Sequence, residues 1–279
     1  MSATQRIPVT ILTGFLGAGK TTLLNNIIQE HPDTRFAIIE NEFGKESVDS
    51  DLIVDAEGGI FDLSRGCICC TLNGELVELL QDLVSRRDEF DHLIVETTGV
   101  AEPAEIAGAF LAEPRINADF ALNSVVCLVD GEHFFETLDE RPEVRQQLIY
   151  SDLVLINKGD LVESDVLDSI TDTIPGINPF TEIRRAHKGD PGPEIMQGLL
   201  NRYAFYPEKL SGILENGKMD LKRHRDIVSV SLRVKEPIDP IKFGHWVQLL
   251  LLVQRERIYR IKGIMNFPFR DSQIVFHSV

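Results

Sequence analysis

A stretch near the N-terminus has the residue types and the spacing of a loop that binds phosphate groups. Residues 14–21 run glycine, four residues, glycine, lysine and threonine, a pattern that brings backbone amides to a triphosphate between a strand and a helix. We expect Lys20 to contact the β- and γ-phosphates and Thr21 to ligate Mg²⁺. A glycine-rich turn that merely contains these residues is the alternative. The loop residues predicted to bind the nucleotide are Gly14, Gly17, Ala18, Gly19, Lys20, Thr21 and Thr22.

A second motif indicates which base is bound. Asn157, Lys158 and Asp160 follow an apolar run at residues 153–156 and match the pattern Asn, Lys, any residue, Asp. The Asp160 carboxylate can accept hydrogen bonds from N1 and N2 of guanine, whereas adenine offers no such pair of donors. Polar turns after strands are common, but the order of this motif after the phosphate loop favours GTP. His187 is a further candidate for the base pocket, with an exposed loop histidine as the alternative.

An acidic residue at the end of another apolar run could serve in catalysis. Glu96 follows the run at residues 93–95, and Gly99 lies three positions further on. Glu96 could hold Mg²⁺ through water or position the attacking water, and the Gly99 amide could sense the γ-phosphate. An acidic strand end with a polar turn is the alternative. Lys20 and Glu96 are therefore the predicted catalytic residues, and Thr21 and Glu96 the predicted Mg²⁺ ligands.

Three of the four cysteines crowd together at Cys67, Cys69 and Cys70. This spacing suits a metal site better than a disulfide framework, and thiolates favour Zn²⁺, with Co²⁺ or Cu⁺ as rivals. Three protein ligands leave one tetrahedral position open, which suits transfer of the metal. Glu40 is the nearest candidate carboxylate for that position, although a place beside Mg²⁺ or at a helix start suits it equally. The competing interpretation is a redox dithiol, which usually keeps two residues between its cysteines.

The surrounding sequence alternates strands with helices. Runs rich in Val and Ile are predicted as strands buried on both faces, with segments of helical spacing between them. This alternation predicts an α/β fold of the P-loop NTPase type, with a mostly parallel sheet flanked by helices. Ligands bind at the carboxyl ends of such strands, which is where Gly14, Glu96 and Asn157 fall. The predicted strands are residues 9–13, 36–40, 93–96, 125–129 and 153–156, and the predicted helices are residues 21–30, 75–86, 104–111, 144–150 and 165–174.

A change of pattern marks the expected domain boundary. Pro, Gly, Asn and charged residues dominate around residues 207–225. We therefore expect a GTPase domain at 1–206, a linker at 207–225 and a small α+β domain at 226–279. That domain is predicted to contain strand-like runs at 227–234, 258–264 and 273–279 and a helix at 240–254.

The composition restricts the partners. A formal net charge of −16, from 44 acidic and 28 basic side chains, repels nucleic acid and anionic lipid. No apolar run reaches the roughly 18 to 20 residues that span a bilayer, and the N-terminal ten residues lack a signal-peptide cleavage pattern. We expect a cytoplasmic protein, a monomer or homodimer, that binds neither nucleic acid nor membrane.

Together these motifs resemble the CobW-like family of GTPases. The resemblance covers nearly the whole chain, and its most specific mark is the motif Cys, any residue, Cys, Cys at residues 67–70. It implies a metallochaperone, that is, a GTPase that binds Zn²⁺ or Co²⁺ at those cysteines and delivers the metal to a client metalloprotein. The other segments that carry the resemblance are the phosphate loop and residues 40–44, 96–99 and 157–160.

Three features depart from the family pattern. Lys45 stands where the family commonly carries an acid, and only His224 represents a stretch that is His-rich in many members. Relatives also extend beyond the equivalent of Val279, so the C-terminal domain would be shortened or incomplete. These departures bear on metal buffering and on docking of the client.

The functional hypothesis is that GTP and Mg²⁺ order residues 41–55 and thereby couple the γ-phosphate to the cysteine site. Hydrolysis would then alter the metal affinity and release the metal to the client. One alternative is a metal storage or sensor protein that makes little use of GTP hydrolysis. Another is a nucleotide-dependent kinase or biosynthetic enzyme with a structural zinc.

Overall fold

The chain divides into two compact units, Met1–Ala204 and Phe205–Val279. The computed structural model describes residues 6–40, 61–62, 75–200, 232, 234, 236–254, 258, 261–269 and 274–278. The predicted linker at 207–225 lies outside these residues, as does most of the predicted strand at 227–234.

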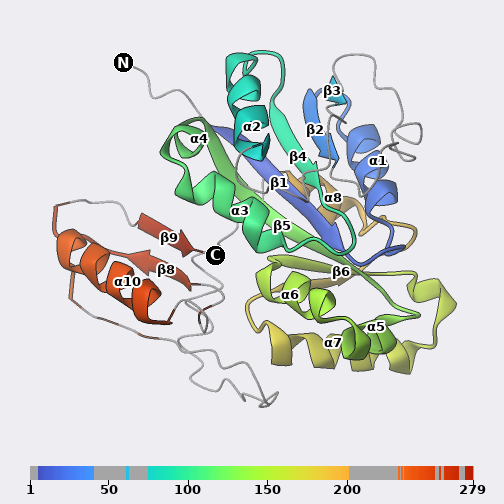
Figure 1. The fold of residues 1–279 in the computed structure, drawn as a ribbon. Coiled ribbons are helices and arrows are strands. Elements are labelled where there is room, and N and C mark those ends of the chain that lie inside the picture. The colour runs from blue at the N-terminus through green and yellow to red at the C-terminus, as the bar shows by residue number, and fades with distance from the viewer. Residues whose placement is uncertain are drawn as a thin grey trace. The chain divides into compact units, whose positions relative to one another are not determined.

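The first unit is built on a seven-stranded sheet in which all pairs of neighbouring strands are parallel (Figure 1). The strand order is β3-β2-β4-β1-β5-β6-β7. The central strands are nearly continuous runs of buried residues, as expected for a sheet covered on both faces. All five predicted strands are confirmed. The strands are β1 (Ile7–Gly14), β2 (Phe36–Glu40), β3 (Phe61–Asp62), β4 (His92–Glu96), β5 (Phe120–Asp130), β6 (Leu153–Asn157) and β7 (Glu182–Arg185).

Helices cover both faces of this sheet. In Figure 1, α3 and α4 lie in front of the strands and α8 lies behind them. One core cluster joins Leu23 and Ile27 of α1 to Leu199 of α8 and to Leu12 and Leu128 of the sheet. The helices are α1 (Lys20–Glu30), α2 (Glu75–Ser85), α3 (Pro103–Ala112), α4 (Pro114–Asp119), α5 (Phe134–Glu140), α6 (Pro142–Tyr150), α7 (Ser164–Ile177) and α8 (Pro193–Leu199), with a short 3₁₀ turn at Gly159–Leu161.

The five predicted helices are confirmed, with small changes at their ends. Four of the helices in this unit begin with proline at the first helical position, where its fixed φ suits the helix and its missing N–H is not needed. The predicted end at residue 174 is wrong for α7, because Pro175 sits in the last turn and the helix continues to Ile177. The short helices α4, α5 and α8 were not predicted.

The described part of the second unit is one helix and one hairpin. Helix α10 (Pro240–Gln254) begins after Asp239, whose Oδ1 accepts hydrogen bonds from the amides of Ile241 (2.9 Å) and Lys242 (3.1 Å). Strands β8 (Ile261–Met265) and β9 (Ile274–Ser278) pair in antiparallel fashion. Among the described helices of the chain, none is long and apolar enough to cross a bilayer.

Candidate nucleotide-binding site

The candidate site lies along the edge of the sheet where the parallel strands end. Gly14 closes β1, Glu96 closes β4 and Asp130 closes β5, while Asn157 closes β6. The strand register places Asp130 directly opposite Asn157. Residues that are far apart in the sequence are therefore neighbours at the edge where open α/β sheets bind ligands.

Three glycines shape the loop between β1 and α1. Their φ angles are +138° at Gly14, +76° at Gly17 and +103° at Gly19, values that L side chains rarely adopt. A Cβ at Gly14 would lie 2.2 Å from the carbonyl oxygen of Leu128, whereas no atom lies within 4 Å of a Cβ built at Gly17. The loop is thus packed tightly against β5 at its base and is open at Gly17.

The start of α1 offers backbone donors to an anion. Its N-cap residue, Gly19, has no side chain to cap the helix, and the first turn contains no acidic residue. The first amides of a helix lack partners within the helix and carry the positive end of its dipole. This end of α1 therefore fits a phosphate group chemically, as the sequence predicts.

Lys20 is buried and lies across the loop. Its Nζ donates hydrogen bonds to the carbonyl oxygens of Gly14 (3.0 Å) and Phe15 (3.4 Å). The ammonium group is therefore held at the loop by these two carbonyl oxygens.

The two predicted Mg²⁺ ligands come together from separate elements. The Thr21 hydroxyl donates a hydrogen bond of 3.0 Å to Oε1 of Glu96, and the Glu96 side chain is buried. Oxygen donors of this kind are the ligands that Mg²⁺ prefers. Thr21 and Glu96 thus fit a Mg²⁺ ion, with Glu96 at the end of β4 and Thr21 in the first turn of α1. Thr22, also predicted to contact the nucleotide, is exposed on α1.

Gly99 is held between the phosphate loop and α6. A Cβ at Gly99 would lie 2.4 Å from the backbone nitrogen of Leu16, so only glycine fits there. The buried Gln147 of α6 donates from Nε2 to the carbonyl oxygens of Gly99 (3.0 Å) and Ala101 (3.4 Å). The loop after β4 therefore touches the tip of the phosphate loop at Leu16.

Asn157 ties the predicted base and phosphate loops into one site. Its Nδ2 donates to the carbonyl oxygen of Ala18 (2.9 Å), and its Oδ1 accepts from the amide of Gly189 (2.9 Å). A Cβ at Gly19 would lie 2.4 Å from the same Nδ2. The side chain is buried, and both halves of its amide are used.

The structure brings His187 to Asp160, the residue expected to recognise guanine. His187 Nδ1 lies 3.2 Å from Asp160 Oδ1, and the two side chains are 65% and 38% exposed. Paired backbone hydrogen bonds between His187 and Asp190 close the turn that carries Gly189. The histidine is therefore both exposed, as its alternative interpretation holds, and adjacent to the predicted base site.

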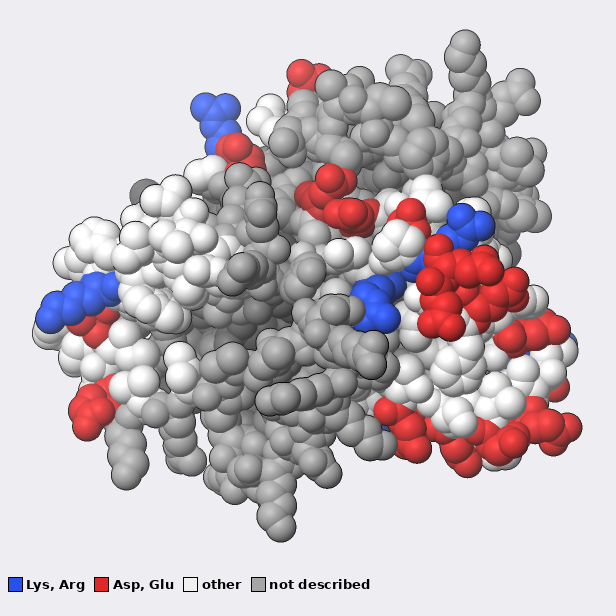
Figure 2. All heavy atoms as spheres, turned by 60° about the horizontal axis from the view of Figure 1, so that its bottom comes forward, with Lys and Arg blue, Asp and Glu red and all other residues white. Residues whose placement is uncertain are grey.

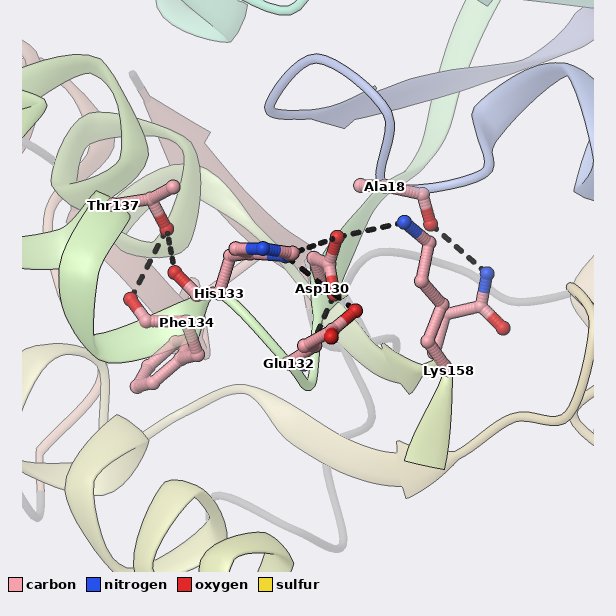
Figure 3. Close-up of polar contacts among 8 residues, drawn as sticks. Ala18, Asp130, Glu132, His133, Phe134, Thr137 and Lys158 are labelled. Carbon is pink, nitrogen blue, oxygen red and sulfur yellow. Dashed lines mark hydrogen bonds and ion pairs between the residues drawn. The ribbon is translucent and has the colours of Figure 1, made fainter. Parts of the chain in front are cut away.

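The sequence analysis missed Asp130. Figure 3 shows its carboxylate between Lys158 and His133: Oδ2 lies 2.8 Å from Lys158 Nζ and 3.3 Å from His133 Nδ1. Burial alone would raise the pKa of Asp130, but hydrogen bonds from Lys158 and from the amide of Glu132 hold it below its usual value. The available signal was position, because Asp130 ends a buried strand as Asn157 does.

A cavity of about 370 Å³ adjoins the tip of the phosphate loop. Residues 15–17 form one wall, and His133 and Arg141, which flank α5 at its two ends, line the others. The Arg141 guanidinium carbon lies 6.0 Å from the centre of the Phe15 ring. Asp130 and Lys158 also line this cavity, so their ion pair faces the phosphate loop.

The predicted transition-metal site lies outside the described residues. This holds for Cys67, Cys69 and Cys70 and for the predicted switch at 41–55. The backbone of Glu40 is described: it ends β2 in register with Glu96 of β4. The fourth cysteine, Cys127, is fully buried, and this burial raises the pKa of its thiol to about 12, so it is a core residue.

The parallel sheet, the glycine-rich loop and the following helix define a P-loop nucleotide-binding protein. Residues 8–184 match the family model described as CobW/HypB/UreG, nucleotide-binding domain, and residues 227–279 match the cobalamin synthesis protein cobW C-terminal domain. The chain belongs to the CobW/HypB/UreG family of P-loop GTPases.

Several relatives of this chain are named zinc chaperones. The zinc chaperone YjiA of Escherichia coli is 33% identical over 98% of this chain and 86% of its own length. The zinc chaperone CobW of Pseudomonas aeruginosa is 31% identical over 100% of this chain and 82% of its own length.

Solved structures agree with this assignment. The Zn(II)-bound YjiA GTPase from E. coli superposes with a TM-score of 0.64 at 26% identity, covering 99% of this chain and 87% of that one. HypB from Helicobacter pylori in complex with nickel shares the fold, with a TM-score of 0.50 at 18% identity over 77% and 90%.

Proposed function

We propose that this GTPase is a metallochaperone that binds Zn²⁺, or Co²⁺, at Cys67, Cys69 and Cys70 and transfers it to a client metalloprotein, with the nucleotide state setting the metal affinity. The observation that carries the nucleotide half is the bridge made by Asn157, which joins the phosphate loop to the loop beside Asp160. The metal half is supported by the cysteine motif and by the zinc chaperones among the relatives.

In the proposed reaction, water attacks the γ-phosphorus and the bond to the β,γ-bridging oxygen breaks, which yields GDP and phosphate. Lys20 and the first amides of α1 bind the phosphate oxygens and offset their charge. Glu96 and Thr21 hold Mg²⁺, which supplies further charge stabilisation when bound. We also propose that Glu96 orients the attacking water.

The metal enters this scheme as cargo. Three thiolates bind Zn²⁺ and leave one position for Glu40, water or a ligand of the client. Support for coupling to the nucleotide comes from the sheet, because the backbones of Glu40 and Glu96 are register partners on adjacent strands. A segment that leaves β2 at Glu40 therefore starts beside the acid proposed to hold Mg²⁺.

The first test concerns the nucleotide. Lys20→Ala should weaken GTP binding by about a hundredfold or more, because it removes charge-assisted hydrogen bonds to the phosphates. Isothermal titration calorimetry measures the affinity, with Lys242→Ala, an exposed lysine of the second unit, as the matched control. Unchanged binding of GTP to Lys20→Ala would overturn the assignment of the phosphate loop.

The second test concerns the metal. GTP hydrolysis is followed while Zn²⁺ or Co²⁺ is titrated into the wild type and into a variant with Cys67, Cys69 and Cys70 changed to Ser. We expect the metal to change the hydrolysis rate of the wild type only, and Cys127→Ala to behave as the wild type does. If the triple variant and the wild type respond alike, and neither passes metal to a client, a storage or sensor role with idle hydrolysis replaces the proposal.

A further inference from the structure

We infer that Asp130 is a positioning residue for nucleotide binding, which acts by holding the Lys158 side chain against the phosphate loop. The inference rests on the proposed function, since it concerns the same nucleotide site. It assigns a role to a residue that lies outside both the phosphate-binding and the guanine-recognition motifs.

The backbone of Lys158 has an unusual conformation. Its φ is +57°, in the left-handed region that non-glycine residues rarely occupy, and it lies between Asn157 and the 3₁₀ turn that carries Asp160. Such a conformation persists only where the surroundings determine it, and it is often found at functional sites. It directs the Lys158 side chain toward the end of β5 rather than along β6 (Figure 3).

The Lys158 side chain forms an ion pair with Asp130. Nζ of Lys158 lies 2.8 Å from Oδ2 of Asp130, whose side chain is only 11% exposed. The other carboxylate oxygen, Oδ1, accepts the amide of Glu132 at 3.0 Å, which fixes the orientation of the acid. The backbone below is closed by a hydrogen bond of 2.9 Å from the Gly131 amide to the Asn157 carbonyl oxygen. Asp130 is therefore a rigid acceptor, and Lys158 adapts to it.

This ion pair lies beside the phosphate loop. Lys158 lines the same cavity as Phe15 and Gly17, so its side chain runs beside the open part of the phosphate loop. Asn157, the preceding residue, already binds Ala18 of that loop. The aliphatic part and the ammonium of Lys158 are therefore held in the cavity beside the phosphate loop. A mobile Lys158 would have to be ordered again each time a nucleotide binds.

The experiment is a double-mutant cycle on the full chain with Asp130→Asn, Lys158→Met and both together. GDP and GTP affinities are measured by calorimetry, and KM and kcat are measured for GTP. Asp130→Asn keeps the shape of the side chain and should weaken GDP and GTP equally, by about five- to tenfold for one partly buried charged hydrogen bond. In the Lys158→Met background the same change should have almost no effect.

The cycle separates positioning from a merely structural tie between the strands. Positioning predicts a raised KM with kcat within about twofold, because Lys20, Thr21 and Glu96 remain in place. Glu132→Gln is the control and should leave KM unchanged, because the Glu132 side chain is 48% exposed and its carboxylate lies 3.8 Å from His133 Nδ1. If Asp130→Asn does not fold, Asp130→Glu, which keeps the charge on a longer chain, takes its place in the cycle.

Three results would count against the inference. Normal GDP and GTP affinities in Asp130→Asn would overturn it while leaving the proposed function intact. If Asp130→Asn lowers the nucleotide affinity by the same factor in the wild type and in the Lys158→Met variant, Asp130 does not act through Lys158. Failure of the wild type to bind GTP would overturn the proposed function itself, and the inference with it.

Discussion

Asp160 is the residue on which the choice of base depends. It is 38% exposed and close to His187, so its carboxylate is accessible to a ligand. Guanine presents two donors, N1–H and the 2-amino group, and an anionic carboxylate accepts both. Xanthine carries a carbonyl oxygen in place of that amino group, and therefore needs a donor from the protein at the same position.

Asp160→Asn should accordingly exchange the base preference. GTP binding should weaken about a hundredfold, because two hydrogen bonds to a charged group are lost, and xanthosine triphosphate should become the tighter ligand. Competition titrations with both nucleotides measure the change, with Asp165→Asn on the exposed start of α7 as the control. If Asp160→Asn binds both triphosphates as the wild type does, Asp160 does not contact the base.

Among the individual residues of the candidate site, those that belong to motifs of fixed spacing could be predicted from the sequence. Lys20, Thr21 and Asn157 are where the pattern places them, because the pattern itself encodes a strand, a turn and a helix. Asp130 was missed because its partner, Lys158, is 28 positions away and only the β5–β6 register brings them together. The contact of His187 with Asp160 likewise arises from packing of two loops.

The phosphate loop, as an element, combines backbone strain with tight packing. Gly14 and Gly17 both have positive φ, but only Gly14 lies against other atoms. Substitution of Gly14 therefore tests the packing of the fold, and substitution of Gly17 tests the binding of the ligand.

Gly14→Ala should destabilise the protein by about 3 kcal/mol or more, since the new Cβ would overlap with the Leu128 carbonyl in addition to the strain at φ +138°. Gly17→Ala should lower the free energy of unfolding by only about 1–2 kcal/mol, the usual cost of a left-handed residue. The loss in the free energy of GTP binding should be larger than this loss of stability. Urea unfolding and calorimetry on both variants provide the comparison. Equal stability losses would contradict the packing described for the loop.

The elements that were predicted are those long enough to show a period. The five strands of the sequence analysis and helices such as α2 and α7 present several turns or a continuous apolar run. Helices α4, α5 and α8 have six or seven residues, too few for a period to stand out. Strand β3 has only two residues, and its place at the sheet edge follows from pairing with β2.

Among the described residues of the nucleotide-binding unit, His92 is the buried histidine. His92, at the start of β4, is 2% exposed and hydrogen-bonds through Nε2 to Thr10 Oγ1 at 2.9 Å. Burial, with a smaller effect from the charge of His31, lowers the pKa of His92 to about 4. The folded protein thus keeps His92 neutral under conditions where the unfolded chain would protonate it.

The stability of the wild type should therefore fall as the pH is lowered from about 6.5 toward 4, since the unfolded state binds the extra proton. Between pH 7 and pH 5 His92 alone accounts for about 2 kcal/mol, from 1.36 kcal/mol per pH unit below the unfolded pKa. His92→Gln, which can still bond Thr10, should lose less stability over this range. Urea unfolding at the two pH values measures both, and identical pH dependences would exclude His92 as the cause.

The surface of this unit agrees with the acidic composition. Figure 2 shows acidic side chains gathered in clusters on the face that it draws. Glu136, Asp139 and Glu140 of α5 and Asp168 of α7 are all exposed. Such a surface disfavours polyanions.

For the molecule as a whole, we propose that the nucleotide state and the metal affinity are coupled. The most direct measurement is the Zn²⁺ affinity of the protein loaded with a non-hydrolysable GTP analogue and of the protein loaded with GDP, determined by competition with a chelator. We expect the two Zn²⁺ affinities to differ by about fivefold or more, and Zn²⁺ to shift the ratio of the two nucleotide affinities by the same factor. Equal Zn²⁺ affinities in the two states would contradict the coupling.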